Sequence, residues 1–253
     1  MLAIFNRLVA NLDDEDAMLE VLEELMTLRA SYAIAHACDG FGMTVPEALE
    51  LIRSEAELDF TDENKRESLL AAFDNLIDFA VAEEYQMVRD ALGIEDDEEA
   101  EKIFSKYNRQ YVVAENKDIE YAMIVAASLA SVKSHTILTY WTQGDERVRP
   151  WHRTYEGYSA TKEHFPGWLV PPIEHGCRCF LVEDVTDMGV MAASGKEPEM
   201  PEWFNPTFKE SVAFGGRIFS DEHPYFQIDK EHIKVLTQIS DRIKSQYFNG
   251  KTD

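Results

Sequence analysis

Cysteine is scarce in this chain, and its cysteines are not arranged as a disulfide framework. Only three occur among 253 residues: Cys38, Cys177 and Cys179. An odd number that includes a Cys-x-Cys pair is not typical of a secreted domain stapled by disulfides. The count indicates a reducing compartment, in which Cys38 is expected to pack as a small buried hydrophobe.

Long hydrophobic runs are also missing. No stretch of about 18 apolar residues occurs, and the best apolar segment, residues 122–132, is short and rich in Ala and Ser. The apolar opening MLAIF is soon followed by four acidic residues and by no small-residue cleavage site. We therefore expect neither a secretory signal nor a membrane-spanning helix.

Basic residues are few in the first 101 positions, which hold 27 acidic but only 6 basic side chains. The rest of the chain holds 21 acidic and 18 basic side chains, so most of the net charge of −24 belongs to the front. Because an acidic surface repels phosphate, direct binding of nucleic acid by this half is not expected. The charge indicates either a solubilising surface or a docking surface for a basic protein partner.

Helical patterning is the main feature of the front half, where apolar residues recur at helical spacing. The expected helices cover residues 14–36, 44–57, 61–92, a short segment opening at 95–101, and 118–138. Gly40 and Gly42 are expected to end the first of these helices and Gly93 the third. Thr44 and Glu47 have the spacing of a capping box, which predicts the start of the second.

The composition changes near Thr139, after which most of the Pro, Trp, His and Gly residues occur. Segments 136–143 and 177–185 predict two strands with a loop-rich stretch between them. Residues 188–206 are expected to be a loop, and Gly215 and Gly216 a turn into a further strand. A last helix is expected at 229–248, and its apolar face is formed by Ile233, Leu236, Ile239 and Ile243.

These patterns together predict an α+β protein in three parts. Residues 1–115 form a mainly helical acidic module. Residues 116–190 form a small loop-rich α+β domain with a leading helix, and residues 191–253 form a C-terminal arm and helix. His223 to Phe226 could anchor that arm on a neighbouring molecule or on this chain, and the sequence leaves both open.

A dense group of polar and aromatic residues lies between Trp141 and Cys179. It reads W-T-x-x-D-x-R-x-R-x-x-H, then a glycine, a proline step and C-R-C. The residues that form it are Trp141, Thr142, Asp145, Arg147, Arg149, His152, Gly157, Pro171, Pro172, Cys177, Arg178 and Cys179. The pattern resembles the head-morphogenesis domain (Mu F-like, or minor head protein, family) of tailed bacteriophages, over roughly residues 119–183. A weaker likeness covers residues 204–226.

The resemblance implies a minor head protein of a tailed phage or prophage. Such a protein is expected in the virion head, and in the bacterial host cytoplasm during assembly. It would associate with the portal, the procapsid or other head proteins, with self-association open, and would assist head assembly or genome delivery. Its working parts would be binding surfaces and not a catalytic centre.

A structural zinc ion is one cofactor that these residues allow. Zinc prefers thiolate and imidazole ligands in a tetrahedron, and His152, His175, Cys177 and Cys179 offer four. Some members that look similar carry cysteines at the positions of Arg149 and His152, and Arg149 cannot bind a metal. The alternative is that the two cysteines alternate on a strand, one facing the core, while His152 and Asp145 hold the loop by hydrogen bonds.

The charged residues of the pattern have two interpretations. On an extended segment Asp145, Arg147 and Arg149 would share a face and lock the loop through ion pairs. Paired arginines, joined by Arg178, could instead bind an anion. Trp141 and Pro172 complete the expected structural motif.

Two other functions compete with a head protein. One is a metal-dependent nuclease or toxin-type enzyme built on the same module, although no H-E-x-x-H or P-loop signature occurs. The other is an acidic host adaptor protein. Metal content and activity on nucleic acid would separate the first from a structural protein, and co-purification with head proteins would separate the second.

Overall fold

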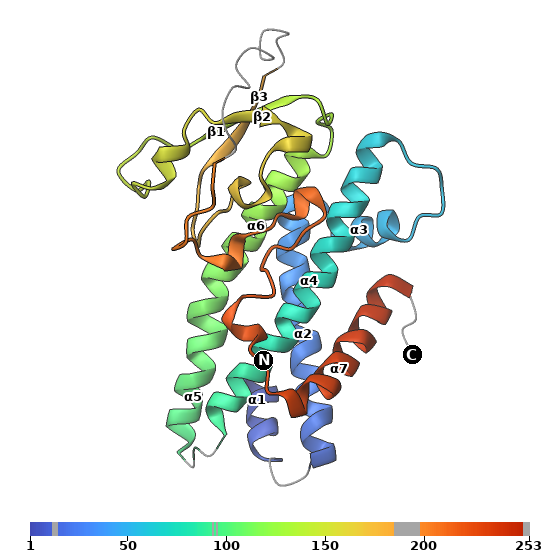
Figure 1. The fold of residues 1–253 in the computed structure, drawn as a ribbon. Helices are drawn as coiled ribbons and strands as arrows, with labels where there is room; N and C mark the ends of the chain where they lie inside the picture. Colours follow the sequence, from blue (N-terminus) through green and yellow to red (C-terminus); the bar gives the residue numbers. More distant parts are fainter. Residues whose placement is uncertain (12–14, 93, 95, 185–197, 250–253) are drawn as a thin grey trace.

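The computed structural model describes residues 1–11, 15–92, 94, 96–184 and 198–249. A bundle of long helices carries a small three-stranded antiparallel sheet at one end, above the last turns of α6 (Figure 1). The expected α+β class with a helical N-terminal part is confirmed. Buried apolar residues form one continuous cluster that includes side chains of the helices, the sheet region and the C-terminal segment.

Three long helices make the bundle: α2 (Glu15–Phe41), α4 (Phe60–Ala91) and α6 (Val112–Leu129). Helix α2 packs against both of the others. A short helix that the sequence did not predict, α1 (Leu2–Val9), lies at the foot of the bundle and buries Phe5 and Leu8. Its eight residues are too few to show a clear helical repeat, and its stability comes from this packing. Cys38 is buried in α2, as predicted.

Helix α2 extends five residues beyond its predicted end. Gly42 ends it in the left-handed conformation with φ of 76°, but Gly40 lies inside the helix. A Cβ atom on Gly40 would lie 2.3 Å from the backbone oxygen of Glu120 on α6. Gly40 therefore allows the two backbones to cross closely, and the interpretation of it as a helix stop was wrong.

Helix α3 (Val45–Ile52) begins as predicted. The Thr44 side chain accepts a hydrogen bond from the backbone of Glu47, and the Glu47 carboxylate accepts one from the backbone of Thr44. The helix ends five residues earlier than expected. Helix α4 is capped by Asp59, so it begins at Phe60, one residue before the predicted start. The predicted stop at Gly93 lies outside the described residues, as do Asp13, Asp14 and Glu95.

Helix α5 (Asp97–Ser105), a π-helical turn (Lys106–Tyr111) and α6 follow one another without a break. The helix predicted at 118–138 therefore begins earlier, and it ends earlier too, at Leu129. The Lys162 ammonium group donates to the carbonyl oxygens of Leu129 and Val132 at this end. Residues 137 and 138 belong to a strand instead, because β-branched and aromatic neighbours favour sheet pairing there.

The sheet has β1 (Ile137–Trp141) in the centre, with β2 (Ser159–Thr161) and β3 (Phe180–Asp184) antiparallel on either side. Both predicted strands form and pair, and β2 was not predicted because it has only three residues. Leu138 and Tyr140 on the inner face of β1 are fully buried. Both cysteines of the C-R-C lie in the loop just before β3.

The C-terminal segment returns along the bundle to α7 (Lys230–Asn249), shown in orange and red in Figure 1. Gly215 makes the predicted turn, but a short 3₁₀ turn precedes it and no strand follows in the described residues. On α7 the predicted apolar face is buried except at Ile233, which is 48% exposed. Most of the loop predicted at 188–206 lies outside the described residues.

The arm packs on its own chain. The aromatic ring of Phe219 stacks on that of Phe79 in α4, with centroids 4.3 Å apart. The rings of His223 and Tyr225 lie 5.0 and 5.3 Å from the same Phe79 ring. The side chain of Asn75 in α4 donates to the Phe219 carbonyl and accepts its N–H.

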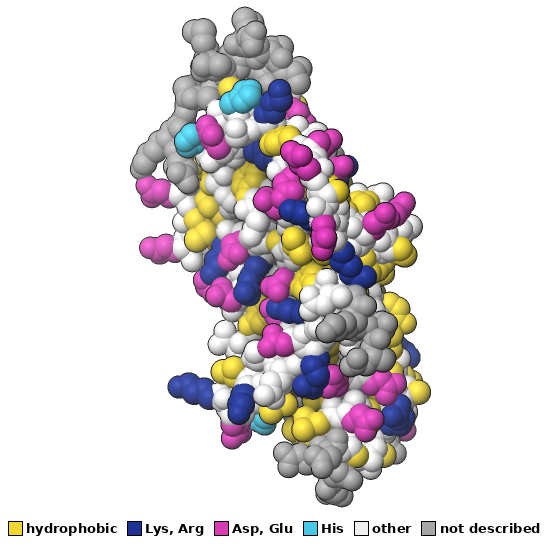
Figure 2. Space-filling view, turned by 90° about the vertical axis from the view of Figure 1, so that its right-hand side faces the viewer, with side chains coloured by type: hydrophobic (Ala, Val, Ile, Leu, Met, Phe, Trp, Pro, Cys, Tyr) yellow, Lys and Arg dark blue, Asp and Glu magenta, His cyan; other side chains and the backbone are white. Residues whose placement is uncertain are grey.

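Among the described residues, none of the helices is both long enough and apolar enough to cross a bilayer. Figure 2 shows one face of the molecule, on which acidic side chains are spread widely with Lys and Arg among them. The described side chains on that face form no continuous basic patch.

Candidate metal centre

Two loops of the back region bring a histidine and two cysteines together inside the protein. His152 follows the turn after β1, and Cys177 and Cys179 precede β3. All three side chains are buried, and their ligand atoms lie within 4.8 Å of one another. His152 Nδ1 is 3.2 Å from Cys179 Sγ and 3.8 Å from Cys177 Sγ. This group can hold a metal ion.

Glu174 determines how the imidazole of His152 is presented. One carboxylate oxygen, Oε2, lies 3.2 Å from His152 Nε2 and accepts from Trp151 Nε1 at 3.1 Å. Arg149 Nε lies 3.1 Å from the same oxygen. A carboxylate only accepts hydrogen bonds, so the neutral imidazole carries its proton on Nε2. Its Nδ1 lone pair then faces the two sulfur atoms, which is the arrangement that a metal ligand requires.

The two sulfur atoms are electrostatically coupled. A hydrogen bond between them raises the pKa of Cys177 well above its usual value, and burial raises it further. The same hydrogen bond lowers the pKa of Cys179, to which Tyr140 also contributes. Of the two thiols, Cys179 is therefore the one that loses its proton more easily. Thiolate character is what a metal ion selects in cysteine.

Two tyrosines flank this sulfur pair in different ways. Tyr121 on α6 donates its hydroxyl proton to the backbone carbonyl of Cys179 at 2.6 Å. Tyr140 on β1 is fully buried, and a hydrogen bond from its side chain helps to lower the pKa of Cys179. A small cavity of about 10 Å³ adjoins His152 and both cysteines. That volume is on the order of one water molecule or ion.

These observations agree with the donor set of a zinc-type site. An imidazole nitrogen and two sulfurs converge, and a carboxylate supports the imidazole. In the alternative interpretation, the alternation of the two cysteines on a strand is wrong, because β3 begins only at Phe180 and both side chains are buried in the preceding loop. His152 and Asp145 do make hydrogen bonds to this loop, as that interpretation expected.

The structure does not bring His175 to this group. Its Nδ1 atom lies 2.8 Å from the Asp118 carboxylate on α6, which also accepts from the backbone of Gly176 at 2.7 Å. The imidazole is 43% exposed. Asp118 therefore anchors the loop to the leading helix and holds His175 away from the sulfur atoms.

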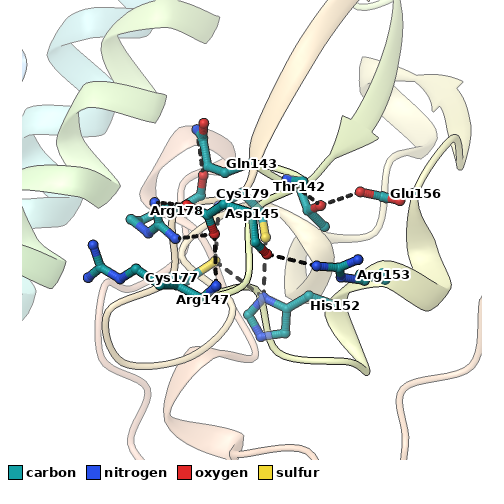
Figure 3. A network of polar contacts seen from close by, with 11 residues as sticks. Thr142, Gln143, Asp145, Arg147, His152, Arg153, Glu156, Cys177, Arg178 and Cys179 are labelled. Atoms are coloured by element: carbon teal, nitrogen blue, oxygen red, sulfur yellow. Dashed lines mark hydrogen bonds and ion pairs between the residues drawn. The ribbon is translucent and has the colours of Figure 1, made fainter.

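Two arginines of the pattern form ion pairs beside the centre, and Figure 3 shows the pair of Arg178 with Asp145. Both oxygens of Asp145 accept from Arg178, at 2.7 and 2.9 Å, which holds the pKa of Asp145 below its usual range. Arg149 pairs with Glu174. The guanidinium of Arg147 makes no ion pair with any described residue. Residues 145–148 form a turn and not an extended segment, so the three expected residues do not share a face.

Trp141 and Pro172 are the remaining residues of the expected structural motif. Trp141 ends β1 opposite Phe180 and is 42% exposed. Pro172 is buried and follows a cis peptide bond from Pro171. Trp151 covers the group, and its ring packs against that of Trp203, which is 62% exposed.

Sequence reasoning missed three residues of this centre: Glu174, Asp118 and Tyr140. Glu174 stands next to His175 in the segment PPIEHGC, and an acidic residue near candidate ligands was the available signal. Asp118 and Tyr140 carry no local signal, because their roles depend on which segments meet in the fold.

A larger cavity of about 560 Å³ lies elsewhere, between α4, the π-helical turn, α6 and the arm. His175 is at its wall, but His152 and the cysteines are not. The cluster of His152, Cys177 and Cys179 therefore does not line that cavity.

Comparisons of the chain with protein-family models, with curated proteins and with solved structures give no match. The fold and the site define an α+β protein with a buried His/Cys/Cys group. The resemblance to a phage family rests on the motif residues themselves.

Proposed function

We propose that this chain is a minor head protein of a tailed bacteriophage or prophage, which associates with the portal or procapsid and assists head assembly or genome delivery. One observation supports this most directly. Motif residues up to 34 positions apart in the sequence, from Asp145 to Cys179, meet through ion pairs, hydrogen bonds and sulfur contacts. A chance pattern would not be expected to converge in this way.

The site favours a structural role within that function. Its sulfur atoms and imidazole are buried, and the arginines that line its small cavity include two that are paired with carboxylates. We propose that the metal is zinc, because two sulfurs and one imidazole are ligands that zinc prefers. The ion would tie the loop after β1 to the loop before β3 and so stabilise the small domain.

The function is tested in the bacterial strain that encodes the chain. After prophage induction, tailed particles and procapsids are purified, and the chain is measured by quantitative mass spectrometry in wild type and in a gene deletion. We expect the chain at low copy in heads, and fewer DNA-filled heads in the deletion. Absence of the chain from both particle types, with unchanged particle yield, would refute the proposal.

Metal content is tested separately on the purified protein by elemental analysis. We expect close to one zinc ion per chain in the wild type, and loss of the zinc with lower thermal stability in a His152→Ala, Cys177→Ser double variant. Metal-dependent cleavage of DNA or RNA by the wild type, lost in the double variant, would instead support the enzyme alternative.

A further inference from the structure

The cavity of about 560 Å³ between α4, the π-helical turn, α6 and the arm has the size of a small-molecule site. Pockets that bind organic ligands enclose roughly 300–1,000 Å³. Six of its lining side chains offer an aromatic ring or a nitrogen donor: Tyr107, Tyr111, Tyr225, Arg89, Lys106 and His223. They come from α4, the π-helical turn and the arm, so three segments that are distant in sequence face one space.

Lys106 is the cation best placed to meet an anion in this cavity. Its Nζ atom lies 5.5 Å from the ring centroids of both Tyr107 and Tyr111, a cation–π arrangement that holds the ammonium group beside the rings. Lys106 is partly buried, and its ammonium group makes no ion pair with any described residue. The lysine also lies on a π-helical turn, a feature that occurs frequently at functional sites.

Two further donors line the same space. His223 Nδ1 accepts from the backbone N–H of Tyr225 at 3.2 Å, so the proton of the neutral ring lies on Nε2. Burial lowers the pKa of His223 to about 4, which keeps the ring neutral near pH 7. Its Nε2–H has no hydrogen-bond partner in the part of the chain that the structure describes. The Arg89 guanidinium has only a loose partner, with Nη1 3.9 Å from an Asp229 oxygen.

The two carboxylates of the wall are already engaged. The Tyr107 hydroxyl donates to Asp90 at 2.8 Å, and the Tyr225 hydroxyl donates to Glu115 at 2.9 Å. Glu115 also lies 3.3 Å from the buried guanidinium of Arg29. The groups that remain for a ligand are therefore cations, an imidazole N–H and ring surfaces. This combination favours a planar anion over a cation.

We propose that the cavity binds a small phosphorylated ligand with a planar ring, of the nucleoside monophosphate class. A phosphate group carries close to two negative charges and three strong acceptor oxygens, which match the donors of Lys106, Arg89 and His223. The base would lie against the tyrosine rings, because stacking on aromatic side chains stabilises any base. The cluster of His152, Cys177 and Cys179 lies outside this cavity, so the inference depends neither on a metal ion nor on a role in the phage head.

Calorimetric titration of the full-length protein tests the proposal, with AMP, GMP, CMP and UMP as probes. Inorganic phosphate and the nucleoside of the tightest-binding nucleotide are titrated for comparison. We expect at least one nucleotide to bind roughly 10-fold more tightly than either of them, because only the nucleotide supplies both the phosphate and the ring. In Lys106→Gln we expect roughly 10-fold weaker binding of that nucleotide and unchanged binding of its nucleoside.

Lys102→Gln is the matched control, because it removes the same charge from an exposed position of α5 that does not line the cavity. It should bind the nucleotide as the wild type does. A wild type that binds none of the four nucleotides, or binds them no better than inorganic phosphate, overturns the proposal even if Lys106→Gln does not fold. Equal nucleotide affinity in Lys106→Gln and Lys102→Gln also overturns it, because binding would then not involve the cavity lysine.

Discussion

Single side chains in this protein act mainly by fixing the protonation or orientation of a neighbour. Glu174 sets the tautomer of His152, and Asp118 holds the loop that carries the cysteines. In the helical core, Arg29 is fully buried, with its Nε atom 2.6 Å from a Glu83 carboxylate oxygen and its Nη2 3.3 Å from one of Glu115. A single cation therefore faces several buried carboxyl groups.

Glu174→Gln tests the support of the imidazole. The amide can turn its NH₂ group toward His152 Nε2, which favours the tautomer with a proton on Nδ1 and removes the lone pair from the sulfurs. We expect about 10–100-fold weaker zinc binding, measured by competition with a coloured chelator. Glu183→Gln, at an exposed residue of β3, is the control and should bind zinc as the wild type does. Equal affinity in both variants would contradict the role of Glu174.

Glu84→Gln tests the buried charges. Burial raises the pKa of Glu84 to about 8, from 4.5 in the unfolded chain, despite the nearby charge of Arg29. Across that interval the unfolded chain releases a proton that the folded chain keeps, so stability falls as pH rises, by up to about 1.4 kcal/mol per pH unit for one such group.

The expected result is a shallower decline of the unfolding free energy in Glu84→Gln than in the wild type, measured by urea denaturation at several pH values in this interval. The decline does not vanish, because Glu83 is also buried and its pKa is raised too. Glu67→Gln, on the exposed side of the same helix, should follow the wild type. If all three proteins show one slope, Glu84 is not protonated in the fold.

At the scale of elements, the crossing of α2 and α6 positions the leading helix of the sheet domain. Gly40 lies against the Glu120 backbone, and the carboxylate of Glu120 lies 2.5 Å from His36 Nδ1. In the same turn of α6, Asp118 and Tyr121 contact the loop of the C-R-C. The close crossing therefore places one helix face against the bundle and another against the metal centre.

Gly40→Ala should disturb this crossing. The added methyl group would overlap the Glu120 backbone, which cannot move as a flexible side chain does. We expect a loss of about 1–3 kcal/mol in unfolding free energy, measured by chemical denaturation. Gly167→Ala is the control, since its methyl group would meet nothing within 4 Å. A Gly40→Ala protein as stable as the control would show that the helices separate at little cost.

At the scale of the molecule, the arm joins the parts that the sequence suggested. Phe219 is fully buried against Phe79, and Asn75 of α4 binds the arm backbone on both sides of it. The Arg29 network is also closed by the arm, since the Tyr225 hydroxyl donates to Glu115 at 2.9 Å. These contacts favour one cooperative unit, although the three-part division itself stays a prediction.

Phe219→Ala tests that cooperativity. Truncating a buried aromatic ring costs about 3–5 kcal/mol. All four Trp residues lie between positions 141 and 203, so their fluorescence follows the back of the molecule, whereas circular dichroism follows mainly the helices. We expect both signals to melt together at a lowered temperature, with Phe214→Ala, at a ring that is 36% exposed, close to wild type. Two separate transitions in Phe219→Ala would show that the parts unfold independently.

The sequence by itself determined what depends on neighbours along the chain. The capping box at Thr44, the helical repeats, the two longer strands and the buried state of Cys38 follow from local pattern, and the C-R-C with His152 was enough to predict candidate ligands. Tertiary structure decided the rest. Gly40, Asp118 and Tyr140 act on partners that are distant in sequence, and His175 was removed from the ligand set by a carboxylate 57 residues away. A linear pattern carries ligand types and spacing, but only the packing of helices against loops determines which atoms meet.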